Sequence, residues 1–324
     1  MKKSVELLTT GRGNRNLSID IAKGIAIILM VIGHCYHEDN LILKFIYAFH
    51  MPFFFIVSGF LYSGKDEINL PKQTRSLLMP YLIFDGLFAV FLYVSSGFQD
   101  LLSKAISILS LTGVTATWFL PCLFICEGLF VLLKFTNKFR LPIITVLLVF
   151  GLLFPKSPNL IVLQRAFVGL GFFAVGYYAP LLFSKLHKWY FQIIALALFL
   201  LSTLFNDPVS IVDLKFSDPF LYVMSSLSGS YLLIQLSYFI GKFSLNSNKL
   251  LIYLGQNTLI VLCTHMFYVE AIRMIDYKLF NNILYNFSYF EGLLFGIIVV
   301  ALEIITIFVS NRYLWLLFGK KRMK

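Results

Sequence analysis

Charged residues are scarce in this sequence. Asp, Glu, Lys and Arg make up only 13% of its 324 residues, whereas 59% are hydrophobic, and the mean hydropathy is +0.82. A soluble domain of this length needs more charge to cover its surface. The composition therefore excludes an ordinary soluble protein and indicates a chain whose helices contact lipid.

Cysteine is also rare, and the four cysteines do not have the spacing of metal ligands. All four lie in apolar runs, where we expect small apolar fillers rather than a disulfide framework or a metal site. The sequence also lacks linkers, low-complexity tracts and internal repeats. We therefore expect a single transmembrane domain over residues 1–324, with its core at about 15–318 and no soluble domain.

Long apolar runs, in contrast, recur from residue 19 to the end. A helix that crosses the hydrocarbon core needs roughly 20 apolar residues, and the runs lack the period-two alternation of barrel strands. They predict an all-α, polytopic integral membrane protein with about ten transmembrane helices. The predicted spans are 19–37, 41–62, 75–95, 117–135, 141–155, 160–183, 189–205, 218–240, 250–270 and 290–318.

Basic residues are distributed unevenly between the predicted loops. If the N-terminus is inside and the chain crosses ten times, 19 of the 27 Lys and Arg fall in inner segments and 5 in outer ones. Because Lys and Arg mark cytoplasmic segments, both termini are predicted to be cytoplasmic, with 96–116, 206–217 and 271–289 outside. The same distribution argues against nucleic acid as the partner of the +11 net charge. Apolar residues at helical spacing also predict an interfacial helix within 96–116.

Several ionisable residues fall inside the predicted spans, where they are costly and usually face a cavity. They are Asp20, Lys23, His34, His50, Asp85, Glu127, Arg165, His265 and Glu303. Asp20 lies one helical turn before Lys23, so the two are expected to pair. Glu127 needs a proton or a partner, for which Arg165 is the candidate. By depth, His265 and Arg165 share the outer half with His34.

Lys23 and His34 are expected to lie on one face of the first span. They are 11 residues apart, which is three turns plus about 20°, and roughly 16 Å along a helix axis. Lys23 then lies near the cytoplasmic surface, together with Arg75, and His34 near the outer one. Basic groups inside suit an anionic donor, and a neutral histidine suits general-base work on an acceptor.

The second span carries His50, then Pro52, then Ser58-Gly59. Proline frees a helix carbonyl, which is tolerated where the carbonyl lines a cavity. A Ser-Gly step favours close helix packing. His50 is therefore a candidate for the cavity, whereas Ser58 and Gly59 are expected to serve packing.

The run from Asn16 to His34 resembles the opening of the membrane acyltransferase-3 family, which includes sugar O-acetylases similar to fucose 4-O-acetylase. In that family a basic residue, ten intervening positions and a histidine follow one another, and Lys23 and His34 match this spacing. Further blocks resemble the family in the same order, so the resemblance covers about residues 15–318. These blocks are 49–59, 75–81, 118–120, 171–177 and 255–265.

The resemblance implies transfer of an acyl group, usually acetyl from acetyl-CoA, to a hydroxyl of a carbohydrate or glycolipid at a bacterial plasma membrane. It implies that His34 is catalytic, that Lys23 is the basic residue of the motif, and that Arg75 contacts the donor. It implies no permanently bound cofactor. Residue reasoning alone adds supporting cavity candidates, namely Asp20, His50, Glu127, Arg165 and His265.

Two mechanisms and two other functions stay open at this point. His34 either acts as a general base or carries the acyl group transiently. A transporter or flippase for a polar lipid or sugar is the alternative function, since intramembrane His, Glu and Arg also suit proton relays. The missing repeat argues against it. A non-catalytic acceptor-binding subunit is the third hypothesis, and the presence of both Lys23 and His34 argues against that one.

Overall fold

The computed structural model describes residues 16–36, 40–62, 70–96, 98–178, 188–242, 248–280 and 289–319. Within these ranges the chain is helical, and its only β-type pairing is an isolated bridge between Ser210 and Lys215. This confirms the predicted all-α class. The predicted loop residues at 63–69, 184–187, 243–247 and 281–288 lie outside the described ranges, as does the end of the predicted span 160–183 from residue 179 on, so expectations about them stay predictions.

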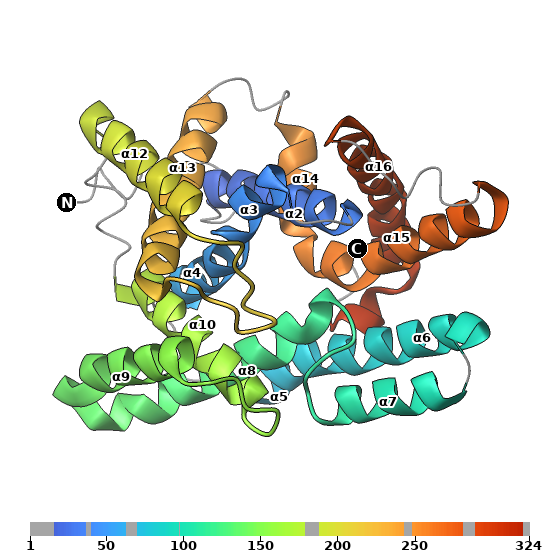
Figure 1. Cartoon of the computed structure of the whole chain (residues 1–324), viewed down its shortest axis with the longest axis horizontal. Coiled ribbons are helices and arrows are strands. Elements are labelled where there is room, and N and C mark those ends of the chain that lie inside the picture. Colours follow the sequence, from blue (N-terminus) through green and yellow to red (C-terminus); the bar gives the residue numbers. More distant parts are fainter. Residues whose placement is uncertain are drawn as a thin grey trace. The chain divides into compact units, whose positions relative to one another are not determined.

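Figure 1 follows the helices along the chain. Their bounds are α2 Leu17–Cys35, α3 Leu41–Tyr47, α4 His50–Tyr62, α5 Leu70–Gln73, α6 Met79–Ser96, α7 Phe98–Leu109, α8 Phe119–Leu132, α9 Arg140–Leu153, α10 Ile161–Tyr178, α12 Trp189–Phe205, α13 Pro219–Lys242, α14 Lys249–Gln256, α15 Thr258–Phe280 and α16 Tyr289–Tyr313. Shorter turns are the π-helical η1, Thr74–Leu78, and the 3-10 segments η2, Ala116–Trp118, η3, Leu133–Phe139, and η4, Trp315–Phe318.

Eight helical segments in the described ranges are long and apolar enough to cross a membrane, which confirms a multi-pass membrane protein. Two predicted spans, α9 and α12, are apolar but shorter than the others. The total of ten crossings and the cytoplasmic termini therefore stay predictions.

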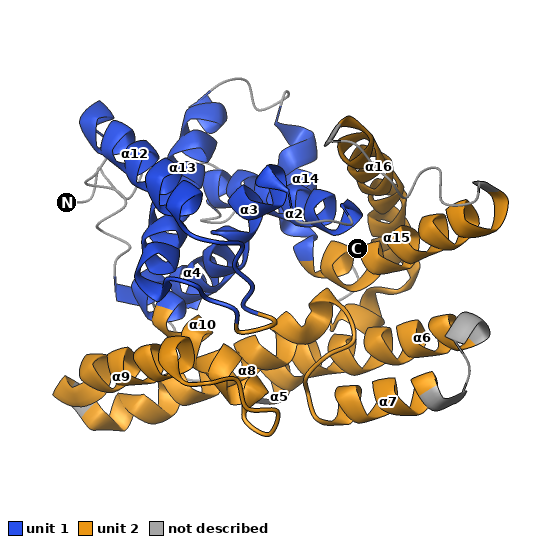
Figure 2. Ribbon diagram, viewed as in Figure 1, with its two compact units in different colours: residues 1–64, 172–211, 215–258 blue, residues 65–171, 212–214, 259–324 orange. Residues whose placement is uncertain are grey.

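The chain divides into two compact units, shown in Figure 2. Unit 1 comprises residues 1–64, 172–211 and 215–258, and unit 2 comprises 65–171, 212–214 and 259–324. Lys23, His34 and His50 belong to unit 1, whereas Arg75 and Arg165 belong to unit 2.

In unit 1, α2 begins at a side-chain cap. The Asn16 side chain accepts a hydrogen bond from the Ile19 amide at 3.3 Å, which satisfies one of the free donors at the helix start. From there α2 runs without a break to Cys35, so Lys23 and His34 lie on one continuous helix. The helical spacing predicted for these two residues is thereby confirmed.

The predicted span 41–62 is one apolar segment, but its helix is interrupted at Ala48 and Phe49. Pro52 has no N–H with which to bond the Ala48 carbonyl four residues earlier. That carbonyl instead accepts a hydrogen bond of 2.8 Å from the Ser226 hydroxyl on α13. The proline therefore frees a carbonyl, as predicted, and a hydroxyl on another helix satisfies it.

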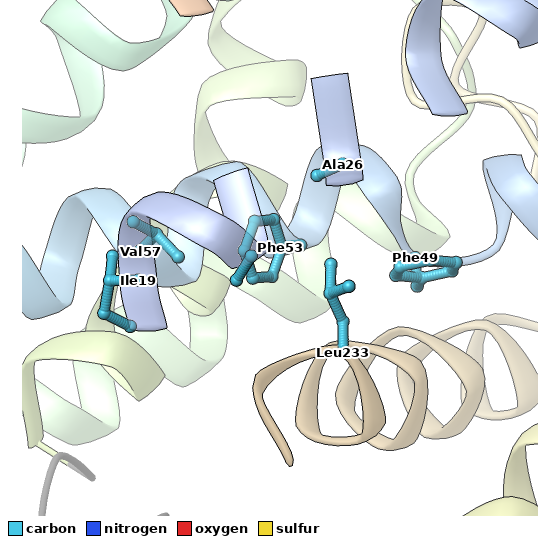
Figure 3. Close-up of a cluster of buried hydrophobic side chains, with 7 residues drawn as sticks. Ile19, Ala26, Phe49, Phe53, Val57 and Leu233 are labelled. Atoms are coloured by element: carbon cyan, nitrogen blue, oxygen red, sulfur yellow. The ribbon is translucent and has the colours of Figure 1, made fainter. Parts of the chain in front are cut away.

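A hydrophobic cluster joins α2, α4 and α13 in unit 1. Its buried members are Ile19, Ala22, Ala26, Phe49, Phe53, Val57 and Leu233, most of them shown in Figure 3. Glycines bring neighbouring backbones into contact: a Cβ on Gly59 of α4 would lie 1.9 Å from the Phe173 carbonyl oxygen, and one on Gly176 would lie 1.8 Å from that of Ile56. The packing role predicted for Gly59 is confirmed.

In unit 2, the π-helical turn η1 precedes Pro80. Because Pro80 has no N–H for the Ser76 carbonyl, the normal helical bond is lost there, and the Met79 amide bonds to the Thr74 carbonyl instead. The amphipathic helix predicted within 96–116 is present as α7, which packs on α6 and leaves Leu102, Ile106 and Leu109 exposed.

The predicted span at 250–270 is displaced. Asn257 ends α14, and its side-chain amide donates to the Tyr253 carbonyl at 2.8 Å, a local bond that competes with helix continuation. A new helix, α15, starts at Thr258 and continues to Phe280. The expected loop from 271 is therefore wrong as far as residue 280.

Candidate active site

The N-terminal end of α2 carries an ion pair of the candidate site. The Lys23 Nζ lies 3.2 Å from Oδ1 of Asp20, one turn earlier, and the Asp20 side chain is buried. This confirms the predicted pair. The pair places the ammonium beside a carboxylate at a position where an isolated charge would be costly.

A third residue completes this end and was not given a role from the sequence. Gln256, the last residue of α14, donates its Nε2–H to Oδ2 of Asp20 at 3.2 Å. The two oxygens of Asp20 thus face different partners, Lys23 on α2 and Gln256 on α14. The sequence signal for Gln256 was its place in the family block that starts at Gly255.

The other end of α2 carries His34, beside a second histidine. The Tyr47 hydroxyl donates to the Gly33 carbonyl at 3.3 Å, and its ring lies 5.2 Å from the His50 ring. His50 is buried, lies within electrostatic range of His34, and has Nδ1 2.8 Å from the Ile46 carbonyl oxygen. That bond requires the proton on Nδ1, so Nε2 of a neutral His50 is the basic nitrogen. Through Tyr47, His50 therefore lies near the end of α2 that carries His34.

Helix α13 adds a row of hydroxyls that sequence reasoning missed. Its Gly241 lies against Ser18, and its Leu233 packs in one cluster with Ala26, so α13 runs antiparallel to α2. The Ser226 hydroxyl on this helix contacts the Ala48 carbonyl, between α3 and α4. Buried hydroxyl side chains of α13 are Tyr222, Ser225, Ser226, Ser228, Ser230, Tyr231 and Ser237. Helix α13 therefore carries many buried polar groups although it is one of the apolar segments.

In unit 2, Arg165 bonds to backbone carbonyls. Its Nε donates to the Val212 carbonyl at 2.9 Å and its Nη1 to that of Thr112 at 2.7 Å. Its guanidinium also lies 5.5 Å from the centre of the Trp118 ring. Arg165 was predicted to pair with Glu127, which is partly buried on α8. The contacts that the structure gives to Arg165 do not include Glu127.

Asp85 holds the segment that connects α7 to α8, which also contains Thr112, a partner of Arg165. It is fully buried and accepts hydrogen bonds from the Val114 amide and the Thr115 hydroxyl, both at 2.8 Å, and from the Thr117 hydroxyl. Three donors satisfy the carboxylate that the sequence placed inside a span. Asp85 therefore has a structural explanation.

The remaining predicted residues of unit 2 lie at separate positions. Arg75 is exposed on the π-helical turn. His265 is fully buried on α15, with Nδ1 2.7 Å from the Val261 carbonyl oxygen. Because α15 starts at Thr258, His265 lies in its first half, which corrects the predicted depth near the end of the span. Glu303 on α16 accepts a hydrogen bond from the Thr264 hydroxyl at 2.8 Å.

Metal ligands do not gather anywhere in the described ranges: no group of three His, Cys, Asp or Glu is placed to hold an ion. All four cysteines are buried, and none of them forms a disulfide. The chemistry of the candidate site thus depends on α2, which carries the Asp20–Lys23 pair near its start and His34 near its end.

Comparison with known families identifies the class. The model of an acyltransferase domain, the acyltransferase-3 type, matches residues 16–309. The chain therefore belongs to the acyltransferase-3 family and is a membrane acyltransferase, which confirms the resemblance drawn from the sequence.

Two relatives share shorter stretches. The nodulation protein NolL of Mesorhizobium japonicum is 37% identical over 89 residues, which cover 23% of this chain and 24% of the relative. NolL of Sinorhizobium fredii is 44% identical over 66 residues, 17% of this chain and 18% of the relative. The matches thus span less than a quarter of the length of either relative. No solved structure matches the chain.

Proposed function

We propose that this acyltransferase takes an acetyl group from cytosolic acetyl-CoA and transfers it to a hydroxyl of a cell-surface or exported saccharide, in a bacterial plasma membrane. The observation that carries the proposal is that α2 holds both the basic residue and the histidine of the candidate site. Lys23, held by Asp20, and His34, beside His50, lie on one unbroken helix. Helical rise separates them by roughly 16 Å, a length suited to an extended thioester arm.

The donor is assigned to the Lys23 end. Acyl-CoA is a phosphate-bearing anion, and an ammonium is a suitable partner for its charged groups. The excess of basic residues in the predicted inner segments supports a cytosolic donor. Arg75, exposed on its π-helical turn, is the further donor contact that the family resemblance implies.

The acceptor is assigned to the His34 end. A base there removes the proton of the acceptor's hydroxyl group while the hydroxyl oxygen attacks the carbonyl carbon of the thioester. The C–S bond breaks, and the CoA thiolate leaves and takes up a proton. Alternatively, His34 first carries the acetyl group.

Variants of His34 test the proposal. Purified protein in nanodiscs is given acetyl-CoA labelled in the acetyl group, together with the cell-envelope carbohydrate fraction of the producing bacterium. We expect His34→Ala to abolish transfer of label at unchanged membrane abundance, because the general base typically contributes about 10²–10⁴-fold. His187→Ala is the matched control, since that histidine has no proposed role. Equal transfer by wild type and His34→Ala would refute a catalytic His34, and a wild type that transfers nothing would refute the function.

A further inference from the structure

Gln256 is the exposed residue among Lys23, Asp20 and Gln256, which are connected by hydrogen bonds. Asp20 is buried, whereas Gln256 is exposed at the C-terminal end of α14. Its bond to Oδ2 of Asp20, 3.2 Å long, joins residues 236 positions apart in the sequence. The Lys23 bond to Oδ1 has the same length. One carboxylate therefore connects an ammonium on α2 with an amide on α14.

The place of Gln256 is set by backbone contact rather than by its own side chain. A Cβ on the neighbouring Gly255 would lie 1.7 Å from the Asp20 carbonyl oxygen, and one on Gly24 would lie 2.1 Å from that of Leu251. Two glycines thus bring α14 and α2 into direct backbone contact. With both helices fixed, the Gln256 amide points at a carboxylate whose position is also fixed.

The bond contributes little to stability, because an exposed amide exchanges its partner for water at little cost. Its effect is on orientation. A carboxylate with a partner on each oxygen cannot rotate about its terminal bond without breaking one of the two hydrogen bonds. Gln256 therefore keeps Oδ1 of Asp20 directed at Lys23, and Asp20 in turn holds the Lys23 ammonium in one place.

We propose that Gln256 is a positioning residue: through Asp20 it sets the location of the Lys23 ammonium for an anionic acyl-CoA donor. The inference rests on the proposed function, in which Lys23 contacts the donor. Gln256 itself touches neither the donor nor the reacting atoms. Its loss should raise the half-saturating concentration of the donor and leave the acceptor step unchanged.

The test uses Gln256→Met, which keeps the length of the side chain and removes its N–H donor. CoA binding to the full chain in detergent is measured by isothermal titration, and acetyl-CoA dependence by steady-state kinetics. We expect the Kd of CoA and the KM for acetyl-CoA to rise about ten-fold, the lower end of what a hydrogen bond to a charged group supplies. The kcat and the melting temperature should stay close to wild type.

Gln192→Met is the matched control, because Gln192 is also a helical glutamine of unit 1 and the structure gives its side chain no hydrogen bond. A double-mutant cycle separates positioning from mere packing. If Gln256 acts through Lys23, the variant Lys23→Met/Gln256→Met binds CoA no more weakly than Lys23→Met alone, because the two losses are not additive.

Each outcome decides between the alternatives. An unchanged CoA affinity in Gln256→Met overturns the inference, as do additive losses in the double variant or a fall in melting temperature that accounts for the weaker binding. A wild-type protein that binds no CoA overturns the proposed function itself, before any variant is compared. If wild type and Gln256→Met both bind CoA normally, the inference about Gln256 fails and the proposed function is not affected.

Discussion

Replacing Gly255 with alanine is expected to push α14 away from α2. The new Cβ would lie 1.7 Å from the Asp20 carbonyl oxygen and 2.9 Å from the Gly24 nitrogen, whereas ordinary van der Waals contact begins at 3.4 Å. Both neighbours are backbone atoms of a helix, which have no rotamer to change. The distance to the Asp20 oxygen must therefore double, and only a shift of the helices achieves this.

The magnitude follows from the kind of atoms involved. Overpacking a well-filled core costs typically about 1–3 kcal/mol, and two rigid backbones favour the upper end of that range. The same shift also stretches the Gln256–Asp20 bond from 3.2 Å beyond hydrogen-bonding distance. Gly255→Ala should therefore lower both the stability of the protein and its affinity for CoA.

Gly128→Ala on α8 is the matched control, since nothing lies within 4 Å of the Cβ that it adds. Alanine in the middle of a helix is favoured over glycine by roughly 0.5–1 kcal/mol, so this variant should be as stable as wild type or more so. Melting temperature and CoA titration are compared for both. A Gly255→Ala protein with normal values would refute the backbone contact, and equal losses in both variants would attribute the effect to alanine rather than to the contact.

Two further predictions concern α13 and the topology. The Ser226 hydroxyl satisfies the Ala48 carbonyl, whereas the Ser230 hydroxyl is buried and has no hydrogen-bond partner among the described residues. Ser226→Ala should thus destabilise by about 1–3 kcal/mol and Ser230→Ala should be neutral or stabilising. Thermal denaturation checks this pair, and the reverse order would contradict it. For the topology, cysteines placed at Ser110 and Ser210 should react with an impermeant thiol reagent on intact cells, and one at Ser247 should not; opposite labelling would reverse the protein in the membrane.

The sequence predicted those features that depend on neighbouring residues. The Asp20–Lys23 pair follows from a spacing of three positions on a helix, and the freed carbonyl at Ala48 follows from Pro52 four positions later. Helical periodicity alone places Lys23 and His34 on one face. Such geometry is fixed by the backbone of one element, so it is visible without knowledge of the fold.

Contacts between helices were not predictable in the same way. Gln256 reaches Asp20 across 236 positions, and Ser226 reaches Ala48 across 178. Both bonds depend on the register in which one helix packs against another, and no local pattern encodes that register. Arg165 is a related case: backbone carbonyls satisfy its guanidinium, and the sequence gives no sign of where a carbonyl will lie.

The depth of His265 was mispredicted because hydropathy does not mark a helix break. The run from 250 is apolar throughout, yet the Asn257 side chain bonds to its own backbone and ends α14. The span then begins at Thr258 rather than at 250. His265 therefore lies in the first half of its helix rather than near the end of the span.

The geometry of α2 favours an acyltransferase over a transporter within unit 1. Because α2 is continuous, the roughly 16 Å between Lys23 and His34 is fixed by helical rise. The backbone contacts at Gly24 and Gly255 also oppose sliding of α2 along α14, since a shift of one residue would bring a side chain into the space that a glycine leaves. A carrier that moves its cargo by such sliding would have to break these contacts in every cycle. The proposed transfer of an acetyl group between two fixed ends would require no such movement, because the thioester arm of the proposed donor would cover the distance.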